Sequence, residues 1–103
     1  MSTELTQKTF SEFTGSGVAL VDFWAPWCGP CRFQLPILEQ VAAQLPQVKI
    51  GKVNVDDYPD LAARFGVNTI PYLIVFKDGA LFRDFVGLRQ TRELVDALSE
   101  ALA

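Results

Sequence analysis

The sequence predicts an α/β fold in which a central mixed β-sheet is covered by helices on both faces. A short, nearly continuous apolar run at residues 18–24 is typical of a strand that is buried on both faces of a sheet, and residues 48–55 alternate well enough for a second buried strand. Segments with apolar residues at helical spacing alternate with these runs. Two further β-rich runs near the C-terminal end are joined by an Asp-Gly step, which is typical of a tight hairpin.

Two helices are predicted in the first half of the chain. Residues 6–13 fit a short helix in which Thr6 can act as the cap, and the turn at residues 15–17 follows it. The second helix begins at the cysteines and ends at about Leu45. Pro36 lies inside this helix and should kink it, because proline removes one backbone donor. The apolar stripe of the second helix consists of Ile37, Leu38, Val41, Ala42 and Leu45.

The second half of the chain adds three strands and two helices. Residues 48–55 alternate well enough for a buried strand, and residues 60–65 fit a short helix that ends at a glycine. Residues 72–76 and 81–86 are the two strands of the hairpin. Residues 91–102 form the last helix, and its apolar stripe is Leu94, Val95, Leu98 and Leu102.

The composition predicts a single domain that spans residues 1–103. Half of the 103 residues are hydrophobic, which is enough to bury a core without disulfide support. The net charge of −3 comes from dispersed charged residues with no basic run, so we expect no nucleic-acid ligand. No apolar run approaches a membrane span of about 20 residues, and residues 1–10 lack the features of a signal peptide. We therefore expect a cytoplasmic monomer that does not associate with membranes.

Both cysteines lie in the stretch WAPWCGPCRF at residues 24–33, and the pair has three possible interpretations. A structural disulfide between Cys28 and Cys31 would close a very short loop, which stabilises a fold by only about 2 kcal/mol. A zinc site needs four ligands, but the chain has no further cysteine and no histidine. Arg32 stands where attachment of a c-type haem would require a histidine. Loop length and ligand number therefore favour the third interpretation, dithiol–disulfide exchange.

Dithiol–disulfide exchange accounts for the spacing of the pair. Two intervening residues at the start of a helix bring the two sulfur atoms within bonding range. Unpaired N–H groups and the helix dipole at that end favour the thiolate of Cys28. Cys31 lies one turn further along the helix and should be the buried, slower partner. Since the chain has no histidine, the natural acceptor for the Cys31 proton is Asp22, a carboxylate inside an apolar strand whose burial should raise its pKa.

The pentapeptide Trp27-Cys28-Gly29-Pro30-Cys31 is identical to the active-site sequence of thioredoxins. The chain resembles that family over nearly its whole length, and the resemblance implies the thioredoxin fold. The Gly-Pro pair between the cysteines separates the sequence from relatives with histidine or tyrosine there, as in disulfide isomerases and glutaredoxins. The other landmarks appear in the expected order, at residues 22–26, Pro36, Val55-Asp56, Ile70-Pro71, Lys77-Asp78-Gly79 and Val86-Gly87.

The resemblance implies a general protein-disulfide reductase, whose substrates are oxidised proteins. Cys28 would attack a substrate disulfide, and Cys31 would then attack Cys28 to release the reduced substrate. Gly29 and Pro30 carry no charge that would stabilise the thiolate further, which fits a donor of electrons better than an oxidant. No cofactor or metal would be bound. Electrons would come from NADPH through a thioredoxin reductase, which would be the partner that regenerates the dithiol.

The resemblance also assigns residues that support the cysteines. Asp22 matches the aspartate that exchanges a proton with the second cysteine, and Lys52 matches its usual charged companion. From the residues alone, a less favoured alternative is that Asp22 is exposed at the end of its strand.

Thioredoxins carry a cis proline at the position of Pro71, although most X-Pro bonds are trans. With a cis bond there, the backbone of Ile70 would be free to pair with an extended substrate segment. The apolar surface around the reactive sulfur would be formed by Trp27, Pro30, Ile70, Pro71 and Leu88, and Gly87 would leave room for the substrate.

Some positions depart from the common thioredoxin pattern. Tyr72 replaces a frequent threonine, Leu88 replaces a frequent alanine, and Phe33-Gln34-Leu35 replaces the more usual sequence after the second cysteine. These residues lie near the expected docking surface and therefore bear on partner choice. Two other functions stay open at this point. One is a binding module that uses the same apolar face with incidental redox activity, and the other is an oxidase or isomerase of an oxidising compartment.

Overall fold

The apolar run at residues 18–24 forms β2 (Val18–Trp24), the central strand of a five-stranded sheet. In the computed structural model, which describes residues 2–103, β2 lies parallel to β3 (Lys49–Asn54) and antiparallel to β4 (Tyr72–Lys77). The sheet is therefore mixed, as the sequence predicts. Because β2 is paired along both edges and six of its seven residues are buried, it needs the apolar sequence that it has.

The two edges of the sheet are formed by β1 (Thr3–Glu4) and β5 (Ala80–Val86), and the strand order is β1-β3-β2-β4-β5. The hairpin between β4 and β5 turns at Asp78 and Gly79, whose φ angles are 50° and 87°. Two successive positive φ angles are what a tight two-residue hairpin requires, and Asp-Gly supplies them readily. The sequence analysis did not predict β1, because two residues are too few to show a period.

Four helices cover the sheet. Their bounds are α1 (Phe10–Thr14), α2 (Gly29–Gln44), α3 (Pro59–Arg64) and α4 (Thr91–Leu102). The prediction for α1 was wrong at its start. The Oγ1 of Thr6 accepts a hydrogen bond from the Thr9 N–H at 3.2 Å, so Thr6 closes the turn before the helix instead of capping the helix itself. The α2 helix continues through Pro36, and Leu45 is its C-cap.

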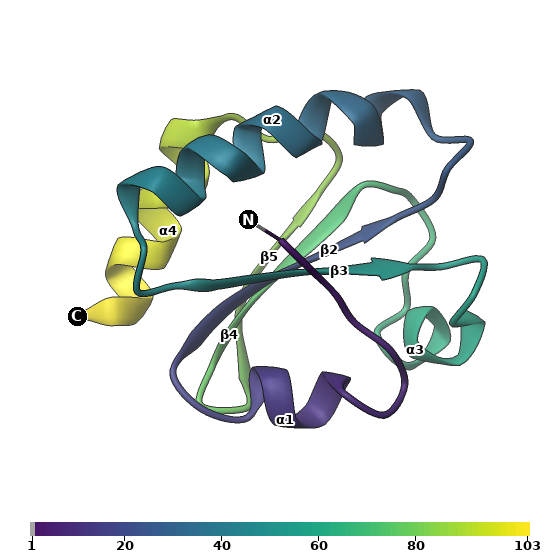
Figure 1. Cartoon of the computed structure of the whole chain (residues 1–103), viewed down its shortest axis with the longest axis horizontal. Coiled ribbons are helices and arrows are strands. Elements are labelled where there is room, and N and C mark those ends of the chain that lie inside the picture. Colours follow the sequence, from purple (N-terminus) through teal and green to yellow (C-terminus); the bar gives the residue numbers. More distant parts are fainter. Residues whose placement is uncertain (1) are drawn as a thin grey trace.

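The helices lie in two layers, with α2 and α4 on one face of the sheet and α1 and α3 on the other (Figure 1). Each layer covers its own hydrophobic cluster. Successive residues of β2 point alternately to the two clusters, so Val18 and Leu20 pack under α2 and α4, whereas Val21 and Phe23 pack against α1 and α3. By this alternation Asp22 shares the face of Leu20 and lies on the side covered by α2.

The predicted apolar stripe of α4 was wrong at Leu102. That side chain is 37% exposed, whereas Ala97 and Ala101 are buried together with Leu94 and Leu98. Each step of four residues along an α-helix rotates the side chain by about 40°, so the second step from Leu94 carries Leu102 away from the sheet.

Gly51 in β3 allows the N-terminal segment to pack on the sheet. A Cβ at this position would lie 2.7 Å from Cδ1 of Leu5 and 2.9 Å from Cε2 of Phe13. We predict that Gly51→Ala lowers the free energy of unfolding by about 1–3 kcal/mol, as overpacked cores do. Urea denaturation measures the change. The cost should shrink in a Leu5→Ala background, and an unchanged denaturation midpoint would contradict the prediction.

Candidate functional site

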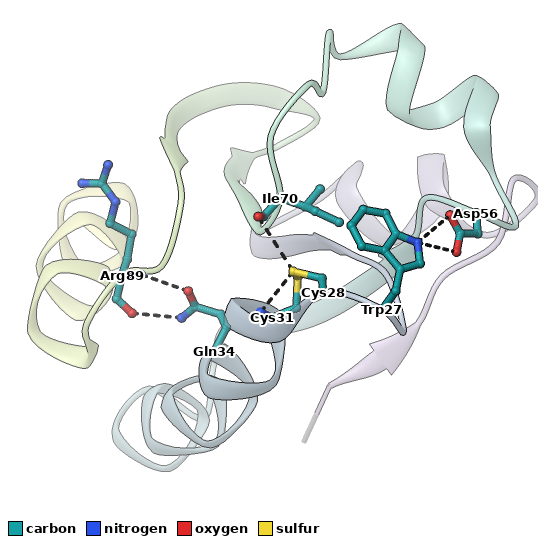
Figure 2. Close-up of a disulfide and its surroundings, with 7 residues drawn as sticks. All are labelled: Trp27, Cys28, Cys31, Gln34, Asp56, Ile70 and Arg89. Carbon is teal, nitrogen blue, oxygen red and sulfur yellow. Dashed lines mark hydrogen bonds between the residues drawn. A yellow bond between two sulfur atoms is a disulfide. The ribbon is translucent and has the colours of Figure 1, made fainter.

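Cys28 and Cys31 lie where the chain leaves the end of β2 and enters α2. Cys28 is the N-cap of the helix, with an extended backbone (φ −87°, ψ 112°), and Gly29 and Pro30 open the first turn. The two cysteines form a disulfide with their Cα atoms 5.3 Å apart. The N–H of Cys31 donates to Sγ of Cys28 at 3.2 Å (Figure 2). A helix N-terminus that donates to this sulfur is suited to stabilising a thiolate at Cys28.

The two cysteines differ in their surroundings more than in their exposure. Cys31 is 3% exposed, as expected for the inner partner, but Cys28 is only 4% exposed. Sγ of Cys28 lies 3.8 Å from the carbonyl oxygen of Ile70, so it faces the loop before β4. Cys31 instead lines a mostly apolar cavity of about 160 Å³ between β2 and α2, together with Trp24, Ala25, Pro26, Arg32 and Leu35.

The Ile70–Pro71 peptide bond is cis, as the resemblance implies, and it lies directly beside Cys28. Within residues 2–103, the N–H of Ile70 forms no hydrogen bond. This donor is therefore available to an extended segment that lies across the sulfur. The carbonyl oxygen of Pro71 accepts from the N–H of Gly87 at 2.8 Å, and Gly87 has a φ of 89°. The loop after β5 is thereby joined to the loop that carries the cis bond.

The residues expected to form the docking surface differ in their exposure. Trp27 is 68% exposed and Leu88 is 39% exposed, both high values for large apolar side chains. Pro30 is also exposed, Ile70 and Gly87 are partly buried, and Pro71 is buried. Exposed apolar side chains around a reactive sulfur are suited to contact with another protein.

Asp22 is completely buried, and neither carboxylate oxygen has a hydrogen-bond partner among residues 2–103. Burial raises the pKa of Asp22 to about 7, and the negative charge of Glu4 adds to the effect, whereas the positive charge of Lys52 opposes it. A carboxyl group with this pKa can gain or lose a proton near neutral pH. The alternative that Asp22 lies exposed at the strand end is wrong.

Lys52 lies beside Asp22 in the neighbouring strand, because the two residues are paired in the β2–β3 register. Its Nζ forms an ion pair with Glu4 at 3.1 Å and lies 5.2 Å from the centre of the Trp24 ring. Lys52 is thus shared between two carboxylates, and its direct ion-pair partner is Glu4. Burial outweighs the positive charge of Lys52, so the pKa of Asp22 stays raised although a lysine lies nearby.

The positions that depart from the common pattern are divided between the surface and the interior. Phe33 is 69% exposed and Leu35 is 37% exposed, whereas Gln34 is completely buried. The hydroxyl of Tyr72 donates to Asp84 on β5, and burial with this partner raises the pKa of Tyr72 to about 12.

The sequence analysis named Asp56 only as a family landmark and Gln34 only as a departure from the common pattern, and it predicted no contact for either residue. Asp56 accepts from Nε1 of Trp27 through both carboxylate oxygens, at 3.0 and 3.3 Å, and so fixes the exposed indole ring (Figure 2). Gln34 forms two hydrogen bonds with the backbone of Arg89. A signal for Gln34 was present, since a polar residue three positions after Cys31 and four before Leu38 falls on the buried face of α2.

Within the described part of the chain, no group of three or more cysteine, aspartate or glutamate side chains is placed to hold a metal ion. The arrangement itself offers groups for thiol–disulfide exchange and proton transfer. It comprises a dithiol–disulfide pair at a helix N-terminus, a buried carboxyl group on the strand beneath that helix, and a free backbone donor beside the outer sulfur.

Comparisons with known proteins agree with this geometry. The thioredoxin family model matches residues 1–100. A thioredoxin of Chlamydia muridarum (strain MoPn / Nigg) is 46% identical over 96 residues, which cover 93% of this chain and 94% of the relative. A thioredoxin of Bacillus subtilis (strain 168) is 40% identical over 98 residues, which cover 94% of each chain.

A solved structure of a mutant thioredoxin from Halobacterium salinarum superposes on this chain with a TM-score of 0.93. It is 32% identical, and the match covers 99% of this chain and 91% of that chain. Sequence and structure comparisons therefore lead to the same family. The chain belongs to the thioredoxin family, and its Cys28–Cys31 pair makes it a protein-disulfide oxidoreductase.

Proposed function

We propose that the chain reduces protein disulfides with Cys28 as the nucleophile and Cys31 as the resolving cysteine. The thiolate of Cys28 attacks one sulfur of the substrate, the substrate disulfide breaks, and the other substrate sulfur leaves as a thiolate that takes up a proton. Cys31 then attacks Cys28, and the second substrate thiol is released. The observation that carries this assignment is the Cys31 N–H on the Cys28 sulfur at the start of α2, because it favours the charged form of Cys28.

We propose that Asp22 accepts the proton of Cys31 during the resolving step. Two observations support this role. Asp22 is buried on the face of β2 that α2 covers, and its pKa is about 7. Lys52 tunes this group through its positive charge, which favours the ionised carboxylate. Gly29 and Pro30 add no charge at the helix start and keep the pair reducing.

The substrate segment is proposed to lie extended across Cys28. It pairs with the free N–H of Ile70 and covers the surface of Trp27, Pro71, Gly87 and Leu88. Hydrogen bonds to backbone groups do not depend on the sequence of the partner. This mode of binding therefore suits a reductase that accepts many oxidised proteins.

We further propose a thioredoxin reductase as the partner that returns the cysteines to the dithiol, with NADPH as the source of electrons. The chain is proposed to act as a monomeric single domain in the cytoplasm. Bacterial thioredoxins among its relatives support these assignments. No helix within residues 2–103 is both long and apolar enough to span a membrane.

Reduction of insulin in the presence of NADPH and a thioredoxin reductase tests the proposed function. The wild-type chain should consume NADPH and precipitate the insulin chains, and a variant with both cysteines replaced by serine should do neither. Absence of turnover by the wild-type chain, when a control thioredoxin is active with the same reductase, would overturn the proposal.

The roles of the two cysteines can be separated by trapping. We predict that Cys31→Ser accumulates mixed disulfides with oxidised proteins, because the attack by Cys28 still occurs and resolution is blocked. Cys28→Ser should trap none, since Cys31 is buried in the first turn of α2 and lacks the N-cap position of Cys28. Non-reducing gel electrophoresis followed by mass spectrometry measures the mixed disulfides that each variant forms. Equal trapping by the two variants would contradict the assignment.

The pH dependence of the resolving step tests Asp22. Below pH 7 the carboxyl group is protonated and cannot accept the Cys31 proton, so the rate should rise as the pH increases through about 7. Asp22→Asn should remove this rise and lower the rate above pH 7 by about 100-fold. Stopped-flow measurement of substrate release from the mixed disulfide is the readout. The matched control is Asp57→Asn, at an exposed aspartate.

Stability provides a second test of the same carboxyl group. The folded state holds the Asp22 proton up to about pH 7, whereas the ordinary value is 3.8, so the protein should lose stability as the pH rises from about 4 to 7. Asp22→Asn should therefore be more stable than the wild type at pH 8, by up to roughly 4 kcal/mol, and similar to it at pH 4. Parallel pH–stability curves for the two proteins would contradict the raised pKa.

A further inference from the structure

Gln34 is a polar side chain in a completely buried position on α2. The helical repeat places it on the same face as Cys31 and Leu38, where an apolar residue would be expected. A buried amide group is costly unless both its N–H and its carbonyl oxygen are hydrogen-bonded. The partners of this amide therefore indicate what the residue does.

Both ends of the Gln34 amide bind the backbone of one residue, Arg89. Nε2 of Gln34 donates to the Arg89 carbonyl oxygen at 3.0 Å, and Oε1 accepts from the Arg89 N–H at 2.9 Å (Figure 2). Two hydrogen bonds to the same residue fix its orientation as well as its position. They fasten the loop between β5 and α4, at residues 87–90, to the helix that begins at Cys28.

Arg89 is also held by its side chain. Its Nη2 donates to the carbonyl oxygen of Val86 at 2.9 Å, and its Nη1 lies 3.2 Å from Oε2 of Glu93. Its guanidinium lies 5.4 Å from the centre of the Phe85 ring. Contacts with β5 and α4, the two elements that flank its loop, therefore set the conformation of the Arg89 side chain. The Gln34 hydrogen bonds instead set the place of this loop relative to the cysteines.

We infer that Gln34 is a positioning residue for substrate docking, which holds the 87–90 loop at a fixed place beside Cys28. The loop carries Gly87 and Leu88, so its position decides whether these residues, Ile70 and Trp27 form one surface. This inference rests on the proposed docking of protein substrates. A small disulfide that touches only Cys28 does not need the loop.

The test is Gln34→Met, a change that keeps the length of the side chain and removes both hydrogen bonds. If the loop then occupies its docking position in about a tenth of the molecules, the KM for insulin should rise about tenfold. The kcat for insulin and the rate with bis(hydroxyethyl) disulfide should stay within about twofold, because Cys28 and Cys31 are unchanged. A purely structural role would lower both rates together through loss of folded protein.

Hydrogen exchange of the Arg89 amide measures directly whether the 87–90 loop is held in place. This N–H donates to Gln34 in the wild type and should be protected, whereas in Gln34→Met it should exchange at a rate close to that of an open loop.

The matched control is Gln40→Met, the same chemical change on the same helix. Oε1 of Gln40 accepts from Oγ1 of Thr91 at 2.6 Å, and its loss should leave both the insulin KM and the Arg89 amide unchanged.

A second variant keeps the test decisive if Gln34→Met folds poorly. Gln34→Glu keeps the shape and the acceptor for the Arg89 N–H, but its carboxylate cannot donate to the Arg89 carbonyl oxygen, so it should also raise the insulin KM. An unchanged insulin KM in a folded Gln34 variant whose Arg89 amide exchanges freely would overturn the inference. Failure of the wild-type chain to reduce insulin would instead overturn the proposed function.

Discussion

Strand β2 is hydrogen-bonded along both edges, to β3 and to β4, and the two core clusters cover its two faces. The rest of the molecule depends on this central strand. The neighbouring strands occupy both edges of β2, and the core covers both of its faces. A site can therefore form only at an end of the strand, and the chain leaves it at the carboxyl end. There it turns and starts α2 with Cys28 as the N-cap. This is also the end of an α/β sheet at which functional sites generally lie. The site is therefore a direct result of the position of β2.

Three segments that are distant in the sequence meet at this end of the sheet. Cys28 contacts the carbonyl oxygen of Ile70, the loop of Pro71 binds Gly87, and the loop after Gly87 returns to α2 through Arg89 and Gln34. The contacts form a closed circuit around the outer sulfur. In a closed circuit, each segment is held from two sides, so the proposed docking surface would have a defined shape before a substrate arrives. Such preorganisation reduces the entropy that binding would otherwise lose.

The electrostatics of the interior depend on the short N-terminal strand. Pairing of β1 with β3 brings Glu4 opposite Lys52, and the two form an ion pair. The lysine therefore divides its charge between Glu4 and the buried Asp22, and burial prevails in setting the pKa of Asp22. A two-residue strand far from the cysteines in the sequence thus contributes to the raised pKa of Asp22.

The elements that the sequence predicted correctly are those with a local cause. A nearly continuous apolar run marks the central strand, the Asp-Gly step marks the hairpin, and the spacing of Cys28 and Cys31 marks a redox pair at a helix start. The two-residue strand β1 was missed because it has no period of its own. The exposure of Leu102 at the end of α4 was missed. The gradual rotation of side chains along the helix determines which of them are buried only once the helix packs against the sheet.

The sequence by itself determined the fold class, the redox pair and the buried strand that carries Asp22, because periodicity and residue chemistry act over a few neighbouring positions. The tertiary structure alone decided which distant residues meet. Arg89 lies 55 positions from Gln34, yet the two are in contact. Ile70 lies 42 positions from Cys28, and only the family resemblance implied that it would lie beside the sulfur. The hydrogen bond between Trp27 and Asp56 likewise joins two residues that are distant in the sequence. Contacts of this kind depend on how helices and strands pack against one another, and no local pattern of residues records that packing.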